Sequence, residues 1–150
     1  MKRRLSILLA LVFLFTAVIG ASGVAVYAAE DENRIAGDDR YETAAKIAAA
    51  KYTSADTVII VRGDDNEKNE PEVVDGLTAS VLAGAKNAPI LLTRQNALPD
   101  ATKEAIEALG AKNAYIIGGT VAVSEDVEKA LEDLGVAVKR VEGADRFATA

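Results

Sequence analysis

The residues best suited to bind a charged ligand are arginines at the ends of expected strands. Outside the first 28 residues the chain contains six arginines, and Arg62 and Arg94 each follow a short apolar run directly. The carboxyl ends of parallel strands share one edge of a sheet, where ligands usually bind. A guanidinium fork suits carboxylate or phosphate groups. The spacing therefore predicts an anion-binding edge, with structural ion pairing of the two arginines as the open alternative.

Catalysis has little support in the residue types. The chain has no His and no Cys, which removes the usual bases, thiol nucleophiles and most transition-metal ligands. The pairs Asp38-Asp39 and Asp64-Asp65 offer oxygen ligands, but the spacing after Asp64 lacks the register of a calcium loop. Gly118-Gly119 lacks the further residues of a dinucleotide or phosphate loop, and we interpret it as a tight turn. We expect no catalysis, no metal and no cofactor.

The elements that position these residues alternate along the chain. Short apolar runs alternate with helical patterns, which predicts an α/β fold with a parallel sheet between helices, in three layers. Thr57–Val61 is β-branched and almost wholly apolar, as a strand covered on both faces should be. The expected helices cover Tyr41–Lys51, Pro71–Ala85, Pro99–Gly110 and Ser124–Gly135, and the other expected strands cover Ile90–Thr93, Ala114–Ile117 and Val136–Val141.

Single residues predict how these helices pack and end. The helical period places Tyr41, Ala45, Ala48 and Ala49 on one face of the first helix. Gly110 suits the left-handed position after a helix, and Ser124 suits the capping position before one.

The first residues have the pattern of a targeting segment rather than of part of a fold. Lys2-Arg3-Arg4 supplies a positive start, and Leu5–Ile19 is an unbroken apolar run without charge. Val26-Tyr27-Ala28 has the small-residue pattern that predicts cleavage before Ala29, so residues 1–28 are interpreted as a signal peptide and 29–33 as a short N-terminal segment. The alternative is an uncleaved anchor, because the uncharged stretch is long enough to span a bilayer. With no Cys, a lipid-modified N-terminus is excluded.

The charge balance excludes two classes of partner. Without the leader the chain carries 14 basic and 23 acidic residues, a net charge of −9. Such an acidic chain does not suit nucleic acid or an anionic membrane surface. Since no disulfide is available to an exported chain without Cys, stability must come from a packed core.

The chain begins to repeat itself near its end. Arg34–Ala44 returns 106 residues later as Arg140–Ala150, with six of eleven positions identical. We therefore expect a first repeat at 34–139 and the start of a second at 140–150, in a longer array of like units. The shared Arg-x-x-Gly-x-Asp-Arg motif is interpreted mainly as structural, with its charged pairs fixing a loop or the interface between repeats. Its members are Arg34, Gly37, Asp39 and Arg40 in the first copy, and Arg140, Gly143, Asp145 and Arg146 in the second.

The chain resembles the cell-wall-binding repeat type 2 family, the anchoring modules of surface proteins in clostridia and other Gram-positive bacteria. The resemblance rests on Arg34–Ala44, Asp75–Ala79, Ala88–Thr93, Ala114–Gly119 and the restart at Arg140. It implies a secreted protein held noncovalently at the cell wall or cell surface by an anionic secondary polysaccharide or a teichoic-acid-like polymer, without catalysis. It also implies a Rossmann-like or Toprim-like fold, and three tandem repeats packed around a pseudo-threefold axis.

The resemblance further links one segment to anchoring, namely Pro89, Ile90, Leu91 and Leu92. These residues also have the character of a buried strand, so their expected role is mainly shape. The segment Gly63–Glu70 is longer and more acidic than the family pattern, and it would repel an anionic polymer unless a divalent cation bridges them or it points away. Asp75 begins the motif that follows it. The alternatives to wall binding are a Toprim-like, Mg²⁺-dependent phosphoryl-transfer enzyme using the paired aspartates, and a purely structural spacer.

Overall fold

The computed structural model of the chain describes residues 34–64 and 74–143, with side chains in the second part from residue 76. The predicted leader, most of the acidic segment and the end of the second motif copy lie outside these residues. No helix in the described part is long and apolar enough to cross a membrane. The described helices are α2 (Arg40–Lys51), α3 (Val74–Lys86), α4 (Asp100–Leu109) and α5 (Glu125–Asp133), and the strands are β1 (Thr57–Arg62), β2 (Ile90–Thr93), β3 (Asn113–Ile117) and β4 (Ala137–Val141).

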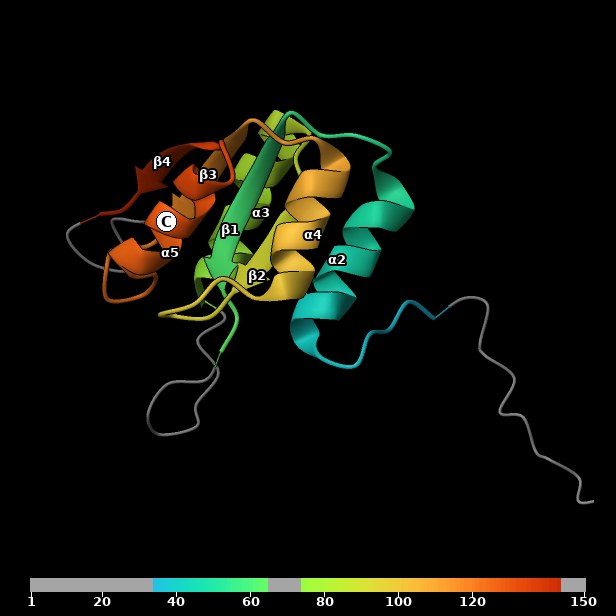
Figure 1. Cartoon of the computed structure of the whole chain (residues 1–150), viewed down its shortest axis with the longest axis horizontal. Coiled ribbons are helices and arrows are strands. Elements are labelled where there is room, and N and C mark those ends of the chain that lie inside the picture. The colour runs from blue at the N-terminus through green and yellow to red at the C-terminus, as the bar shows by residue number, and fades with distance from the viewer. Residues whose placement is uncertain (1–33, 65–73, 144–150) are drawn as a thin grey trace, which may run out of the picture. The chain divides into compact units, whose positions relative to one another are not determined.

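The four strands form one parallel sheet in the order β2-β1-β3-β4 (Figure 1). The crossover from β1 to β2 carries α3, and the two later crossovers carry α4 and α5. Arg62 at the end of β1 is in register with Thr93 at the end of β2. The parallel sheet and the α/β class predicted from the sequence are confirmed.

The central strand β1 is buried on both faces. Its residues Val58–Val61 are each 0% exposed. Alternate side chains enter two cores, because successive residues of a strand point to opposite sides. The first core lies under α2, α4 and α5, and the second lies under α3, which confirms the three layers. The first core comprises Ala48, Ala55, Val58, Ile60, Leu91, Leu98, Ile106, Leu109, Ala114, Ile116, Val123, Val127, Leu131 and Val136, and the second comprises Ile59, Val61, Ala79, Ala83, Ala88 and Ile117.

The strand β2 is one edge of the described sheet, and part of this edge is capped. The carbonyl oxygen of Leu92 accepts a hydrogen bond of 2.6 Å from the hydroxyl of Thr102 on α4. Thr102 is 1% exposed, so this bond satisfies a buried hydroxyl and a strand carbonyl together.

Gly110 and Ser124 occupy the positions predicted for them, and the prediction for Ala49 is wrong. Gly110 has φ +67° in the left-handed position after α4, as predicted. Ser124 occupies the capping position of α5, but its hydroxyl caps nothing and is buried without a hydrogen-bond partner among the described residues. Ala49 was expected on the buried face of α2, yet it is exposed while Tyr41 and Ala48 are buried. With so many alanines, the period alone does not fix which stripe of the helix faces the sheet.

The repeated motif builds the start of α2. The Asp39 carboxylate caps the helix by accepting a hydrogen bond of 2.8 Å from the Glu42 amide. The Glu42 carboxylate in turn accepts from the Asp38 amide, which satisfies a second free donor before the first turn. The hydroxyl of Thr43 accepts from the Gly37 amide at 3.0 Å and donates to the Asp39 carbonyl at 2.8 Å. The structural role predicted for this part of the motif thus has a physical basis.

Position 37 requires glycine because its backbone lies very close to the first turn of α2. A Cβ atom at this position would lie 2.6 Å from Cβ of Glu42 and 2.7 Å from the Thr43 amide nitrogen. Both neighbours belong to the first turn of α2, so neither can move without disturbing the cap.

We predict that Gly37→Ala lowers the free energy of unfolding by about 1–3 kcal/mol, because the methyl group overpacks the cap. Gly84→Ala in α3 is the matched control, since a Cβ there meets nothing within 4 Å. It should raise the free energy of unfolding by about 0.5–1 kcal/mol through helix propensity. Urea denaturation followed by circular dichroism checks both. Equal effects of the two variants would contradict the proposed close approach.

Candidate functional site

The carboxyl ends of the strands and the start of α2 meet at one edge of the sheet. We call this region the carboxyl edge and define it by the residues that follow β1, β2 and β3 and by the first turn of α2. Its members are Arg40, Tyr41, Arg62, Gly63, Asp64, Arg94, Gln95, Gly118, Gly119 and Val121.

Arg62 is engaged by an acidic neighbour within this edge. Its Nε donates to Oδ1 of Asp64 at 2.7 Å, and their side chains are 11% and 26% exposed. The other carboxylate oxygen of Asp64 accepts from the Gln95 amide at 3.2 Å. Asp64 therefore joins the ends of β1 and β2 and compensates the charge of Arg62. The sequence predicted that Arg62 and Arg94 share an edge, and the positions of the two strand ends agree.

Hydrogen bonds hold Asp64 in its ionised form. Burial alone would raise the pKa of this carboxyl group, but the bonds from Arg62 and from the Gln95 amide outweigh it and lower the pKa below the ordinary value. The aspartate thus remains charged at neutral pH and keeps its hydrogen bonds to the ends of both strands.

Arg94 presents a different surface. It is exposed, and its guanidinium carbon lies 4.9 Å from the centroid of the Tyr41 ring. Tyr41 is 4% exposed, and burial raises the pKa of its hydroxyl, so it offers a fixed neutral platform. Within the described residues, the Arg94 guanidinium donates to no protein acceptor. Arg40 binds the Gly63 carbonyl beside it.

Arg140 pins the last crossover in place. Its Nη1 donates to the carbonyl oxygens of Gly118 at 3.0 Å and Val123 at 2.9 Å. Its Nη2 and Nε both bind Oε2 of Glu128, at 2.6 and 3.2 Å. The structural role predicted for this arginine fits these contacts, which join β4, the turn after β3 and α5.

The glycine pair after β3 forms a turn, as its spacing suggested. Gly118 has φ +99°, which glycine tolerates best, and its amide donates to the Val141 carbonyl at 2.9 Å. The Gly119 carbonyl accepts from the amides of Ala122 and Val123 at 2.9 and 3.0 Å. Gly118-Gly119 therefore directs the chain from β3 towards α5.

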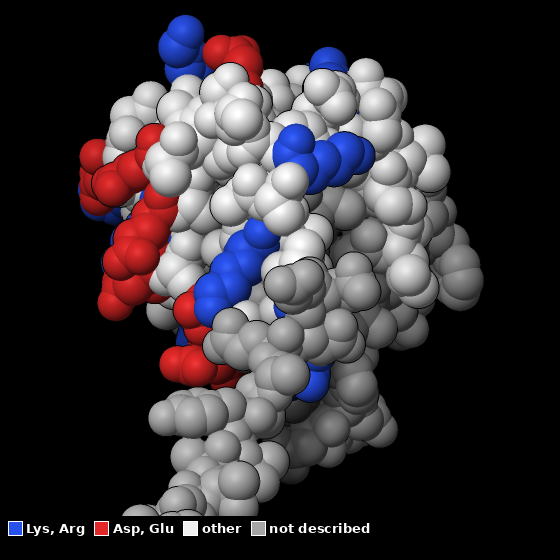
Figure 2. Space-filling model, turned by 90° about the vertical axis from the view of Figure 1, so that its right-hand side faces the viewer, with Lys and Arg blue, Asp and Glu red and all other residues white. Residues whose placement is uncertain are grey.

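The charge is unevenly distributed around the molecule. The first turn of α5 carries Glu125, Asp126 and Glu128. Seen from the side that carries α2, the surface is largely uncharged, with basic side chains across its middle and acidic ones along one margin (Figure 2). An anion would thus be repelled near the first turn of α5.

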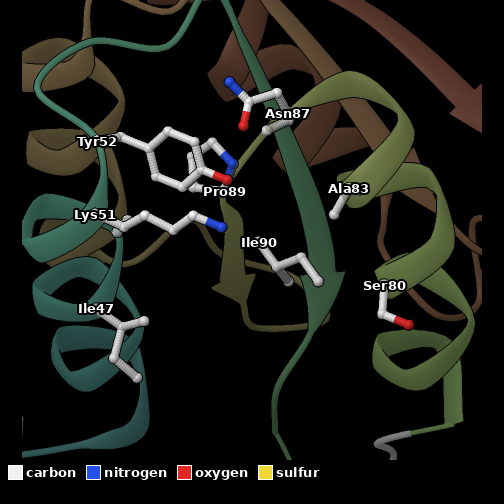
Figure 3. A pocket seen from close by; sticks show the side chains of 11 residues that line it. Ile47, Lys51, Tyr52, Ser80, Ala83, Asn87, Pro89 and Ile90 are labelled. Atoms are coloured by element: carbon white, nitrogen blue, oxygen red, sulfur yellow. The ribbon is translucent and has the colours of Figure 1, made fainter.

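A pocket of about 420 Å³ lies beside the start of β2, between α2 and α3 (Figure 3). Pro89 and Ile90 line it, together with Tyr52, whose ring lies beneath the Lys51 ammonium group at 5.3 Å. Figure 3 shows the Lys51 side chain extending into the pocket. The remaining lining residues are Ile47, Ala48, Ser80, Ala83, Gly84, Asn87 and Ala88.

The segment linked to anchoring by resemblance divides into two kinds of residue. Pro89 and Ile90 reach the pocket, whereas Leu91 is 0% exposed in the first core and Leu92 packs against the second. The two leucines therefore shape the strand, and only its start faces a space that a ligand could enter.

Several predicted site residues do not form a common centre. Asp39 caps α2 and Asp64 holds Arg62, while Asp65, Asp145, Arg146 and the side chain of Asp75 lie outside the described residues. No group of three or more metal-binding side chains gathers in the described part of the chain. The sequence reasoning missed Tyr41 as the support of Arg94. An aromatic residue at the same place in both motif copies, Tyr41 and Phe147, was the available signal.

Comparison with known families decides the class of the chain. The family model for cell wall binding domain 2 matches residues 34–128, which include the carboxyl edge and the pocket beside β2. The chain belongs to the cell wall binding domain 2 family. It is therefore a cell-wall-binding module, as the sequence motifs indicated.

Proteins similar to this chain are much longer than the region that matches it. N-acetylmuramoyl-L-alanine amidase LytC of Bacillus subtilis is 37% identical over 117 residues, which cover 78% of this chain and 22% of the amidase. The amidase enhancer of the same organism is 36% identical over 77% of this chain and 15% of its own length. The chain thus spans less than a quarter of the length of either relative.

Two solved structures share the fold. Cwp8 from Clostridium difficile superposes with a TM-score of 0.66 and 38% identity, covering 77% of this chain and 20% of that one. Cwp6 from the same organism gives the same TM-score with 33% identity, covering 77% of this chain and 17% of that one. The fold of this chain is therefore shared with a part of each of these two proteins.

We predict that Asp64→Asn lowers the free energy of unfolding by about 1–2 kcal/mol at pH 7, because it removes the negative charge 2.7 Å from Nε of Arg62. The folded pKa lies below the unfolded value of about 4, so the stabilisation is full above pH 4 and is lost as the pH falls through the folded pKa. The difference between variant and wild type should therefore shrink towards pH 2–3.

Urea denaturation across this pH range measures the effect. Asp133→Asn is the control, since Asp133 forms an exposed pair with Lys129 and should change stability by less than about 0.5 kcal/mol. A pH-independent loss in Asp64→Asn would contradict the electrostatic explanation.

Proposed function

We propose that this chain anchors a secreted protein noncovalently to the Gram-positive cell wall by binding an anionic polymer, a secondary polysaccharide or a teichoic-acid-like chain. Membership of the cell wall binding domain 2 family supports wall binding itself. The observation that carries the anionic ligand is Arg94, an exposed guanidinium stacked on a buried aromatic ring at the ligand-binding edge of a parallel sheet. The predicted leader supports export.

Arg94 suits a phosphate or carboxylate group for two physical reasons. Its planar fork can form two parallel hydrogen bonds with such a group. Its position over Tyr41 limits its rotation, so less side-chain entropy is lost when the ligand binds. Arg40 lies next to Tyr41 in the first turn of α2 and adds positive charge near Arg94. We assign direct anion contact to Arg94.

Arg62 then acts indirectly, because its pair with Asp64 fixes the position of the residues after β1 and β2. The sequence suggested Arg62 and Arg94 as equal partners of the polymer, but the Asp64 carboxylate already occupies the Nε of Arg62. Releasing that pair would leave a half-buried carboxylate unpaired, which costs more than one new contact returns. Arg62 therefore supports binding through the position of the β2 end.

The pocket beside β2 supports a second contact with the same polymer. Tyr52 and Pro89 provide an apolar wall, while Asn87 and the Lys51 ammonium group add polar donors. Such a combination suits a sugar ring, which has apolar faces and a rim of hydroxyl groups. Pro89 and Ile90 would take part directly, and Leu91 and Leu92 through the shape of the strand.

Each contact of this kind is weak, and repetition adds strength. A chain that carries several repeats would meet one polymer at several places, and the second contact forms at the high effective concentration set by the first. The recurrence of the Arg34–Ala44 motif at Arg140 supports such an arrangement. Anchoring by avidity also permits exchange of single contacts without release from the wall.

We predict that Arg94→Ala weakens cosedimentation of the protein with isolated Gram-positive walls by about tenfold or more, the loss of one charge-assisted bidentate contact. Arg94→Lys should recover only part of the binding, because it keeps the charge and loses the fork. Lys112→Ala is the matched control. Lys112 is 80% exposed at the opposite end of the sheet, before β3, so its loss changes the net charge equally.

Chemical stripping of the secondary polymers from the walls identifies the ligand. Binding should disappear on stripped walls, which retain only peptidoglycan. Binding that persists would move the ligand to peptidoglycan and contradict the polymer proposal. Binding of Arg94→Ala equal to wild type on intact walls would contradict the role of Arg94.

A further inference from the structure

The Asp64 carboxylate connects the residues that follow β1 and β2. Its Oδ1 atom accepts a hydrogen bond from Nε of Arg62 at 2.7 Å, and its Oδ2 atom accepts one from the Gln95 amide at 3.2 Å. Gln95 follows Arg94 directly in the chain, and Arg94 is exposed. The ion pair with Arg62 therefore occupies one oxygen of the carboxylate, while the other oxygen brings negative charge to the end of β2, beside Arg94.

The charges of Asp64 and Arg94 act on a common neighbour, the Tyr41 hydroxyl. The Tyr41 ring lies 4.9 Å from the guanidinium carbon of Arg94. Burial is the main cause that raises the pKa of this hydroxyl; the charge of Arg94 lowers the pKa, and the charge of Asp64 raises it further. Arg40 and Asp39 act on the same hydroxyl, again in opposite directions. The four formal charges, two positive and two negative, sum to zero at this position.

This balance limits the charge that a ligand group can bring to the carboxyl edge. A group bound by the Arg94 guanidinium places its first negative charge against that cation. A second negative charge is repelled by Asp64 and Asp39, and this repulsion grows in proportion to the charge of the ligand. A phosphodiester or a carboxylate carries one charge, whereas a phosphomonoester carries between about 1.5 and 2 at pH 7. The edge is thus matched to groups with a single charge.

We propose that Asp64 is a specificity-determining residue of the carboxyl edge, which disfavours doubly charged groups beside Arg94 and so selects singly charged ones. This role rests on the proposed anion contact of Arg94. In a phosphodiester polymer every inner phosphate carries one charge, and only a terminal phosphate can carry two. Asp64 therefore directs binding to the length of an anionic polymer and away from its phosphorylated ends. The contribution of Asp64 to stability is separate, because it depends on the pair with Arg62.

Two small phosphate esters test this role. Dimethyl phosphate carries one charge, and methyl phosphate carries nearly two at pH 8, because the second pKa of a phosphomonoester is about 6. NMR titration that follows the Arg94 and Gln95 signals, at constant ionic strength, gives the dissociation constant of each ester. Asp64→Asn should strengthen binding of dimethyl phosphate about threefold and binding of methyl phosphate about tenfold, since the repulsion that it removes scales with the charge of the ligand.

Two further variants separate this role from the anion contact itself. Asp133→Asn removes the same charge from an exposed pair on α5, and it should change both dissociation constants by less than about twofold. Arg94→Ala should weaken binding of both esters. Undiminished binding in Arg94→Ala would overturn the anion contact together with the role of Asp64. Weakened binding in Arg94→Ala, combined with equal gains for the two esters in Asp64→Asn, would overturn the role of Asp64 alone.

The wild-type chain provides a second readout that needs no variant. Between pH 8 and pH 5 methyl phosphate loses one charge. Asp64 stays ionised, because burial raises its pKa less than the hydrogen bonds from Arg62 and the Gln95 amide lower it, and the chain has no His to titrate in this range. Wild-type affinity for methyl phosphate should change by less than about twofold, since attraction and repulsion of the second charge nearly cancel. A loss of about tenfold would overturn the proposal.

Discussion

The complete burial of β1 is the constraint on which the rest of the structure depends. Four consecutive apolar residues, Val58–Val61, must leave water on both faces, so the sheet needs helices on both sides and strands on both edges of β1. Parallel crossovers supply both, and they return every strand in the same direction. The strand ends and their polar residues consequently gather at one edge. The surface proposed for binding is thus a geometric result of how an apolar segment is buried.

The arginines of this edge show how one residue type takes different roles according to its acceptors. Arg62 forms an ion pair with the Asp64 carboxylate, which contacts the ends of both β1 and β2. Arg140 donates to two carbonyl oxygens and pairs with one carboxylate, and these bonds hold the last crossover in place. Arg94 meets an aromatic ring, which orients a guanidinium without using its N–H groups. The charge available to a ligand depends on these local partners far more than on the net charge of the chain.

Much of the fold could be predicted from the sequence because β-branched runs, prolines and glycines carry local signals. The strands, the crossover helices and the left-handed Gly110 all follow from such signals. The orientation of α2 could not be predicted, since alanines look alike on every side of a helix and Ala49 turned out exposed. The contact of Asp64 with the Gln95 amide could not be predicted either, because only the pairing of β1 with β2 brings these two residues together. Patterns in a sequence report which residues are buried better than they report which partner a polar residue finds.

The hydrogen bond from Thr102 to the Leu92 carbonyl also limits how the sheet can pair with other chains during folding. Partly folded chains expose unpaired strand edges, and these edges can pair with the wrong chain. An open strand edge invites such exchange, whereas a short edge strand with an occupied carbonyl resists it. At the other edge of the described sheet, β4 carries Lys139, whose charge discourages a foreign strand from adding there. The borders of the described sheet therefore guard against wrong strand pairing during folding.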